Sequence, residues 1–219
     1  MALCAPSLLA ADFLNLGAAV DLVNRKADII HLDIMDGIFV PNISFGFPVV
    51  KAVASVAEKP MDVHLMITRP EKYIPGFAET GASMISFHEE AVAGYGGDVD
   101  ALLGLIRSKG SKAGLVINPD IPVERLYPHL DSADYVLLMS VFAGFGGQKF
   151  IEGTLDRIRT VKKEILRRGL DVKIEVDGGI NASNAPAVVE AGADILVMGS
   201  AVFKAADPES VIDAVRGRN

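Results

Sequence analysis

The sequence has very little cysteine, no long hydrophobic run and no large cluster of positive charge. Its single cysteine, Cys4, excludes a disulfide scaffold and any zinc module built from cysteines, and it fits a reducing compartment. No apolar run reaches the roughly 18 residues that a membrane span needs, and the first residues lack the basic segment of a secretory signal. We therefore expect a cytoplasmic protein that does not interact with a membrane.

Positive charge is scarce as well. The chain has 21 Lys and Arg residues against 28 Asp and Glu residues, which gives a formal net charge of -7. The densest basic segment, residues 157–168, carries apolar residues at spacings of three and four, so its charges form the exposed face of one helix. We expect no nucleic-acid partner.

Apolar sequence is abundant. Half of the 219 residues are hydrophobic and 22% are charged, which excludes a disordered chain. A globule of this size buries roughly 70–75% of the surface of its unfolded chain, so a sizeable core is available. No linker or change of composition divides the sequence, and we predict a single domain over residues 1–219.

A weak repeat runs along the chain. Triplets ending in Ala-Asp or Ala-Ser each precede a short apolar run, and their starts lie about 50 to 60 residues apart, which is the length of two strand–helix units. They occur at residues 26–28, 81–83, 132–134 and 192–194. With the apolar runs between them, the pattern predicts eight strands, at residues 3–9, 29–35, 61–66, 84–88, 112–118, 135–139, 172–177 and 195–198.

Amphipathic segments alternate with these strands. They predict helices at residues 13–25, 47–57, 70–80, 98–109, 122–130, 154–168, 182–191 and 208–216. Eight alternating units indicate a parallel sheet, and the length suits a closed (β/α)8 TIM barrel of the α/β class. An open doubly wound sheet is the alternative, but no Gly-x-Gly-x-x-Gly turn follows the first strand.

Polar residues interrupt the strands near their carboxyl ends, where a barrel of this type carries its active site. His31 and Asp33 share one strand face, His64 lies on the next strand, and Asp177 ends the seventh. Each histidine alone could be a hydrogen-bonded core residue. Four such residues at matched strand ends, two of them carboxylates that are costly to bury unpaired, favour a divalent metal site. Mixed nitrogen and oxygen ligands suit Zn²⁺, Fe²⁺, Co²⁺ or Mn²⁺.

Two other histidines carry less information. We expect His88, at the end of the fourth strand, to be structural, with a hydrogen bond near the site as the alternative, and His129 to lie at the surface.

Glycine clusters follow the sixth, seventh and eighth strands. A single Gly-Gly is usually a turn, but three clusters on successive strands favour a phosphate site made by backbone N–H groups. The clusters are Gly144-Phe145-Gly146-Gly147, Gly178-Gly179 and Gly199-Ser200. Three methionines lie level with the predicted ligands, as core filler or as an apolar collar around a reaction centre. These are Met35, Met66 and Met139.

Seven stretches together carry a resemblance to a known family. They are residues 6–12 (PSLLAAD), 31–37 (HLDIMDG), 39–42 (FVPN), 62–66 (DVHLM), 144–148 (GFGGQ), 175–179 (EVDGG) and 199–200 (GS). On these motifs the sequence resembles the ribulose-phosphate 3-epimerase family from Ala5 to Phe203.

The resemblance implies an isomerase of the pentose phosphate pathway that converts D-ribulose 5-phosphate to D-xylulose 5-phosphate. It implies one divalent metal per chain, with Zn²⁺ the first expectation, no organic cofactor, a phosphosugar substrate and a homo-oligomer. The implied metal ligands are His31, Asp33, His64 and Asp177, and the implied acid and base are Asp33 and Asp177. The implied substrate contacts are Ser7, His64, Asp177, the three methionines and, for the phosphate, residues 144–147, Gly178, Gly179, Gly199 and Ser200.

Elementary chemistry agrees with these roles. Inverting a carbon beside a ketone requires removal of its proton on one face and return of a proton on the other. Two carboxylates on opposite sides can do this through an enediolate, whose charge a Lewis-acid metal stabilises.

One departure from the family pattern leaves the sugar open. Phe142-Ala143 precedes the first glycine cluster where the family usually has proline, which predicts a looser loop and an altered pocket. Thr68-Arg69-Pro70 resembles the allulose-6-phosphate 3-epimerases, so a six-carbon ketose phosphate is the alternative substrate.

Other functions of a barrel fit the sequence less well. A Schiff-base aldolase needs lysine at a strand end, whereas Lys112 and Lys173 begin their strands, and a decarboxylase of the Asp-x-Lys type needs lysine where Met35 stands. A non-catalytic phosphosugar sensor would not need the paired carboxylates.

Overall fold

The structure, a computed structural model, describes residues 2–217. Eight parallel strands pair in the order β1-β8-β7-β6-β5-β4-β3-β2. They are β1 (Leu3–Pro6), β2 (Ile30–Met35), β3 (Met61–Met66), β4 (Met84–His88), β5 (Lys112–Ile117), β6 (Tyr135–Met139), β7 (Lys173–Asp177) and β8 (Ile195–Met198). At the seam between β1 and β2, Cys4 O accepts from Asp28 N and Ile29 N (3.1 and 3.3 Å), and Ser7 bridges to His31. The predicted (β/α)8 TIM barrel is confirmed.

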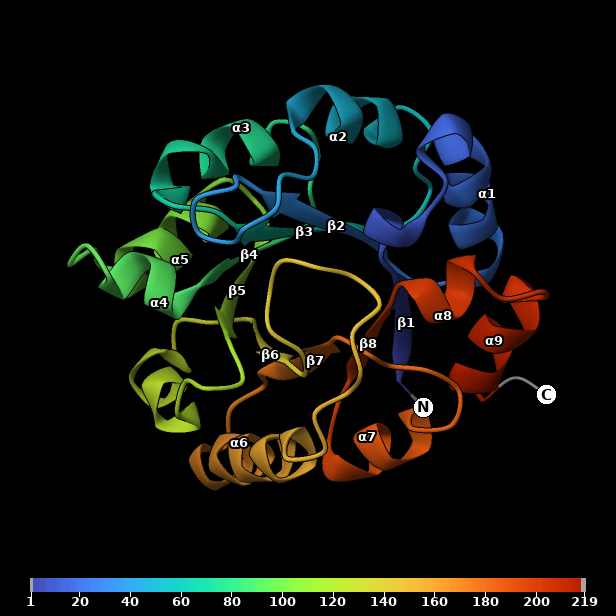
Figure 1. Cartoon of the computed structure of the whole chain (residues 1–219). Helices are drawn as coiled ribbons and strands as arrows, with labels where there is room; N and C mark the ends of the chain where they lie inside the picture. The colour runs from blue at the N-terminus through green and yellow to red at the C-terminus, as the bar shows by residue number, and fades with distance from the viewer. Residues whose placement is uncertain (1, 218–219) are drawn as a thin grey trace.

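Helices surround the strands (Figure 1). The α-helices are α1 (Leu16–Lys26), α2 (Phe47–Ala54), α3 (Ile74–Ala78), α4 (Glu89–Ala93), α5 (Val99–Ser108), α6 (Thr154–Arg168), α7 (Ala185–Ala191), α8 (Ser200–Phe203) and α9 (Pro208–Val215). Short 3₁₀ helices are η1 (Leu8–Ala10), η2 (Phe13–Asn15), η3 (Pro70–Lys72) and η4 (Val123–His129). None of the helices within residues 2–217 is both long and apolar enough to cross a membrane.

Several predicted boundaries are wrong, and two of them have a clear local reason. The strand predicted at 3–9 ends at Pro6, because the Ser7 side chain accepts from Leu9 N and begins η1. The helix predicted at 122–130 is the 3₁₀ helix η4, which contains Pro128, a residue that disrupts an α-helix. The helix predicted at 70–80 is divided into η3 and α3. The short helices α4 and α8 were not predicted.

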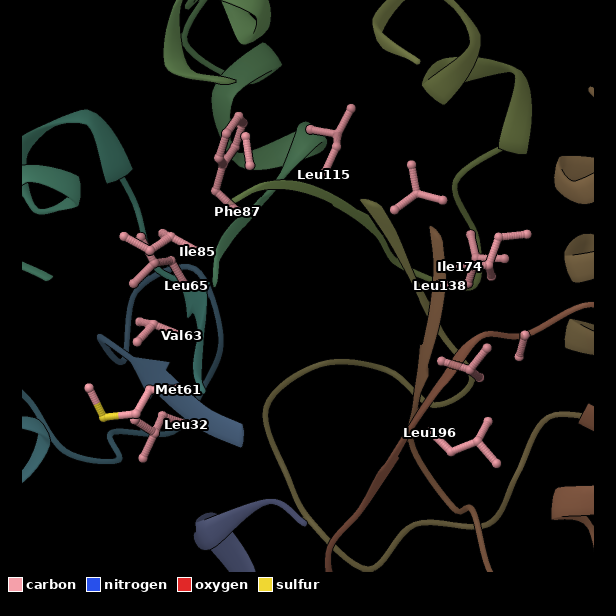
Figure 2. Packing of buried hydrophobic residues seen from close by; sticks show 14 of the residues in the cluster. Leu32, Met61, Val63, Leu65, Ile85, Phe87, Leu115, Leu138, Ile174 and Leu196 are labelled. Carbon is pink, nitrogen blue, oxygen red and sulfur yellow. The ribbon is translucent and has the colours of Figure 1, made fainter. Parts of the chain in front are cut away.

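Alternate residues of each strand face opposite layers of the core. Of two successive residues in a strand, one packs its side chain outward against the helices. Figure 2 shows Leu32, Leu65 and Leu138 in this outer layer. The other side chains fill the barrel interior, where Tyr135 lies fully buried near its floor. Gly114 makes room for Tyr135, because a Cβ at Gly114 would overlap the tyrosine ring. The interior also holds buried polar side chains, among them His31, Asp62 and Glu175.

Three aspartates of the sequence repeat make equivalent contacts at the amino ends of the strands. Asp28, Asp134 and Asp194 each accept a hydrogen bond from a backbone N–H of a neighbouring strand: Cys4 N (3.0 Å), Ala113 N (2.8 Å) and Ile174 N (2.9 Å). Each carboxylate also pairs with a basic side chain: Arg216, Arg107 and Lys162, respectively. The repeated aspartates therefore tie strands to each other and to the surrounding helices.

Candidate active site

The four predicted ligands meet inside the barrel, although His31 is not near the carboxyl end of its strand as expected but is the second residue of β2. The strand register aligns Asp33 of β2 with His64 of β3, and Asp177 is the last residue of β7. Asp33 Oδ1 lies 3.3 Å from His31 Nε2 and 3.2 Å from His64 Nδ1, while Asp177 Oδ2 lies 4.0 and 3.8 Å from the same two nitrogens. One ligand atom from each residue lies within 4.8 Å of all the others. The structure thus brings the four together.

Electrostatics suit a cation at this point. Within residues 2–217, neither Asp33 nor Asp177 has a Lys or Arg partner within 4.0 Å. Burial, and after it the charge of Asp33, raises the pKa of Asp177 to about 7. Burial acts in the same direction on Asp33, but the charge and hydrogen bonds of His31 and His64 hold its pKa well below the usual range. Two buried carboxylates and two imidazoles without a basic partner fit a divalent ion.

A second buried group lies beneath His31. His31 Nδ1 is 2.6 Å from Asp62 Oδ2, and Asp62 Oδ1 accepts from the Tyr135 hydroxyl at 2.8 Å. Glu175 Oε1 is 3.7 Å from His31 Nδ1, and neither Glu175 oxygen has a hydrogen-bond partner among the described residues. Burial, followed by the charge of Asp62, raises the pKa of Glu175 well above its usual range. The hydrogen bond to Asp62 directs Nε2 of His31 toward the four-residue site.

Asp62 and Tyr135 were not predicted to support the site. The available signal is positional: Asp62 stands two residues before His64, so both side chains face the barrel interior. A contact between β2 and β3 also requires the register, which the sequence does not reveal.

His88 contacts the site directly. Its Nε2 lies 3.0 Å from His64 Nε2, and its Nδ1 lies 3.0 Å from Glu90 Oε1. Glu90 Oε1 also accepts from the backbone and side-chain N–H groups of Asn118, at 3.1 and 2.7 Å. The alternative considered from the sequence, a hydrogen bond near the site, is therefore the observed arrangement. His129 is partly buried beside Asp100 and far from these residues in the fold, on η4.

A pocket of about 220 Å³ lies over the ligand group. Asp33 and Asp177 line it, together with Ser7, whose hydroxyl donates to Asp33 Oδ2. The three predicted methionines, Met35, Met66 and Met139, also line it. His31 and His64 are fully buried beneath the pocket and do not line it, so His64, predicted to contact substrate, does not reach the pocket surface.

The residues that were predicted to bind phosphate line one side of the same pocket. They are Gly144, Phe145, Gly146, Gly147, Gly178, Gly179, Gly199 and Ser200. Gly179 has φ +65°, and a Cβ there would overlap the backbone of Phe150, so only glycine lets these two loops approach so closely. Among the described residues that line the pocket there is no Lys or Arg. An anion bound there would meet no basic side chain of the described residues.

The loop between β6 and α6 is held by side-chain hydrogen bonds. Asn118 Oδ1 accepts from Ala143 N (3.0 Å), and Asn42 Nδ2 donates to Gly144 O (3.0 Å). Gln148 Nε2 donates to Phe142 O and Phe145 O, at 2.7 and 2.9 Å. Four hydrogen bonds therefore hold the loop that was predicted to be looser. These contacts could not be predicted from local sequence patterns, because each amide side chain joins segments that are separated in sequence or folded back on themselves.

The lysines considered for a Schiff-base aldolase, and the arginine of the segment that resembles the allulose-6-phosphate 3-epimerases, lie away from the pocket. Lys112 and Lys173 begin β5 and β7 at the opposite end of the barrel, where a Schiff base could not reach the ligand group. Arg69 pairs with Glu71 and does not line the pocket.

Known proteins are similar to this chain over nearly its whole length. The model of the ribulose-phosphate 3 epimerase family matches residues 3–203. The ribulose-phosphate 3-epimerase of Bacillus subtilis is 48% identical over 97% of both chains, and that of Escherichia coli is 44% identical over 98% of this chain and 94% of the relative. The solved structure of 3-hexulose-6-phosphate synthase from Salmonella typhimurium has a TM-score of 0.70 at 18% identity, over 99% of this chain and 97% of that one, which shows a shared fold alone.

The matched region includes the four converging ligands and the three glycine clusters. The resemblance seen in the sequence motifs is confirmed, as is the predicted enzyme class, an isomerase. The chain belongs to the ribulose-phosphate 3-epimerase family.

Proposed function

We propose that the protein interconverts D-ribulose 5-phosphate and D-xylulose 5-phosphate by inverting the configuration at C3, a step of the pentose phosphate pathway. The observation that carries the proposal is the convergence of two carboxylates, Asp33 and Asp177, on one pocket from β2 and β7, which are three strands apart around the barrel. The names of the relatives support the same reaction.

The two carboxylates differ in the way that a base and an acid must differ. Asp33 is held ionised by His31 and His64, which suits it to accept the C3 proton. Asp177, whose pKa burial and the charge of Asp33 raise to about 7, is suited to hold the proton that returns to the opposite face. The electron pair of the broken C–H bond moves to the C2 oxygen, gives an enediolate, and forms the new C–H bond in the second step. In the reverse direction the two aspartates exchange roles.

We propose that His31, Asp33, His64 and Asp177 hold one divalent ion per chain. Mixed nitrogen and oxygen ligands favour Zn²⁺, with Fe²⁺, Mn²⁺ and Co²⁺ as alternatives. Such an ion supplies Lewis acidity that stabilises negative charge on the substrate oxygens. The reaction moves protons and no other group, so it needs no organic cofactor.

The remaining pocket residues bind and orient the sugar. Ser7 holds the Asp33 carboxylate through its hydroxyl, and the buried side chains of Met35, Met66 and Met139 exclude water from the reacting carbon. Backbone N–H groups of residues 144–147, 178–179 and 199–200 are proposed to bind the phosphate, since the described lining residues include no basic side chain.

The deciding experiment follows hydrogen at C3. In D₂O, product formed at low conversion should carry solvent deuterium at C3, detected by NMR, and activity should disappear on chelation and return with added Zn²⁺ or Mn²⁺. Retention of the original hydrogen at C3 would contradict the two-aspartate mechanism, and full activity in metal-free protein would contradict the metal site.

One observation favours a second substrate. Phe142 lies in the segment where the family pattern usually has proline, and it lines the pocket. The pocket surface beside the sugar is therefore proposed to differ from that of the family pattern. D-allulose 6-phosphate is therefore the alternative, and the two sugars should be compared by kcat/KM on the same preparation. A preference for the six-carbon sugar would reassign the substrate without changing the reaction.

We also propose that the protein is a cytoplasmic homo-oligomer. Large apolar side chains are exposed at Leu14 (93%), Ile38 (76%) and Ile43 (73%), and contact with a second copy would remove such surface from water. Analytical ultracentrifugation at micromolar concentration tests the assembly, and a single species with the 23.2 kDa mass of one chain would contradict it.

A further inference from the structure

His64 and His88 meet edge to edge in the barrel interior. Their Nε2 atoms are 3.0 Å apart while the ring centroids are 5.1 Å apart, and the rings are inclined by only 19°. Both side chains are fully buried, and the ring of Phe39 packs against His88 with centroids 4.8 Å apart. A nitrogen–nitrogen contact of this length is a hydrogen bond, so a single proton lies between the two Nε2 atoms.

Glu90 decides which ring carries that proton. A carboxylate only accepts hydrogen bonds, and Glu90 Oε1 already accepts from both N–H groups of Asn118. His88 Nδ1, 3.0 Å away, must therefore donate to it. A neutral His88 protonated at Nδ1 offers a lone pair at Nε2, so His64 donates from its own Nε2. His64 Nδ1 then faces Asp33 and Asp177, at 3.2 and 3.8 Å, and an ion bound there would replace the proton that Nδ1 shares with Asp33.

We propose that His88 is a positioning residue that fixes the tautomer of His64, leaving His64 Nδ1 free to bind a divalent ion. The inference rests on the proposed metal site. His88 does not line the pocket and is not one of the four proposed ligands, so it acts only through His64.

The other histidine ligand is fixed from the opposite nitrogen. Asp62 accepts from His31 Nδ1 directly, which leaves His31 Nε2 for the ion. Nε2 of His64 meets His88 instead of a carboxylate, and the register partner of His64 on β4 is Ser86. His88, two residues farther along β4, connects His64 to the carboxylate of Glu90. Asn118 connects these residues to the loop between β6 and α6. Its side-chain N–H donates to Glu90, and its Oδ1 accepts from Ala143 N.

The first test measures binding of Co²⁺ to the metal-free protein by absorbance. His88→Leu removes the acceptor and should weaken binding about 10–100-fold, while His88→Gln, whose amide can accept from His64, should recover most of the affinity. His129→Leu is the matched control, because it makes the same change outside this chain of hydrogen bonds and should bind as the wild type does. Thermal unfolding of all variants identifies any that fail to fold. Wild-type affinity in folded His88→Leu would overturn the inference.

The second test observes the tautomer without any metal. The chain has only four histidines, so long-range ¹H–¹⁵N spectra can be assigned with single substitutions. In the metal-free wild type, His64 should show the proton on Nε2 and His88 the proton on Nδ1. In His88→Leu, His64 should become a mixture of both tautomers. A His64 without a proton on Nε2 in the wild type would overturn the inference.

The two tests separate this inference from the proposed function. If the wild type binds no Co²⁺, or if His64→Ala binds it as tightly as the wild type, the proposed metal site fails. In that event the spectra still decide whether His88 fixes His64. If the wild type binds Co²⁺ through His64 but His88→Leu does so equally well, only the positioning role fails.

Discussion

At the scale of single residues, identical side chains acquire different properties from their neighbours. Asp33 is surrounded by two imidazoles and stays ionised, whereas Asp177 faces the charge of Asp33 and holds its proton to about pH 7. Both imidazoles lie closer to Asp33 (3.3 and 3.2 Å) than to Asp177 (4.0 and 3.8 Å), and burial contributes to the raised pKa of Asp177. The two carboxylates therefore suit the proposed roles of base and acid.

Replacement of either aspartate should therefore remove turnover. Asp33→Asn or Asp177→Asn should lower kcat by about 10²–10⁴-fold, because an amide cannot carry the proton. Steady-state assays with ribulose 5-phosphate measure this. The control is Asp171→Asn, which should retain full activity, because this side chain is 91% exposed and pairs with Lys173. Activity within tenfold of wild type in both site variants would contradict the assigned roles.

Cys4 gives a second prediction at this scale. Burial, with the nearby charge of Asp28, raises the pKa of Cys4 to about 12, against 9.0 for a free thiol. Between these values the unfolded chain loses the proton and the folded chain keeps it, so Cys4 makes the protein less stable as pH rises above 9. Relative to Cys4→Ala, the wild type should lose free energy of unfolding between pH 8.5 and pH 10.5, at up to about 1.4 kcal/mol per pH unit. Equal pH profiles in urea unfolding would show that Cys4 is accessible.

The four ligands could be predicted from the sequence because strand side chains alternate, so residues two apart share a face. The supporting contacts could not. Asp62 and His88 meet His31 and His64 across strand boundaries, and those contacts depend on register and on side-chain rotamers that no local pattern encodes.

At the scale of elements, the strands were predicted better than the helices. Each strand is a run of four to six mostly buried residues, which leaves a near-continuous apolar signal. Residues 122–130 have helical spacing, but a 3₁₀ helix produces a similar pattern, and Pro128 decides between the two. The glycine loops were located correctly because glycine marks close backbone approach, as at Gly179.

The aspartates at the amino ends of the strands should contribute stability without affecting catalysis. Asp134 accepts from Ala113 N and pairs with Arg107, so Asp134→Ala should lower the free energy of unfolding by about 1.5–3 kcal/mol. The change in kcat should be small, since Asp134 lies at the end of the barrel opposite to the pocket. Urea unfolding and the epimerase assay measure the two effects. The exposed Asp171→Ala is the control and should change stability by less than about 0.5 kcal/mol.

The glycine loop between β6 and α6 gives a prediction about phosphate binding. Gly146 has open space around the position of a Cβ, so Gly146→Val should fold normally while obstructing access to the backbone N–H groups. The expected result is a KM for the sugar phosphate raised about tenfold or more. Lys149→Ala removes the nearest lysine, which does not line the pocket, and should change KM much less. A larger effect from Lys149→Ala would mean that a basic side chain holds the phosphate.

At the scale of the whole molecule, the two ends of the barrel have separate tasks. The amino ends carry the repeated aspartates that join strands and helices, and the carboxyl ends carry the converging ligands and the pocket. Loops at the carboxyl ends can therefore change while the barrel that positions the ligands stays the same.

The depth of the histidines sets an order of events. His31 and His64 lie fully buried beneath a pocket whose floor is formed by Asp33 and Asp177. An ion would reach these nitrogens through the same opening that admits the sugar, so it must arrive first and leave last. The residence time of the ion should therefore lengthen when the pocket is filled. Stopped-flow chelation of Co²⁺-loaded protein should slow several-fold with a saturating, unreactive sugar phosphate, and an unchanged rate would reveal a separate exit for the ion.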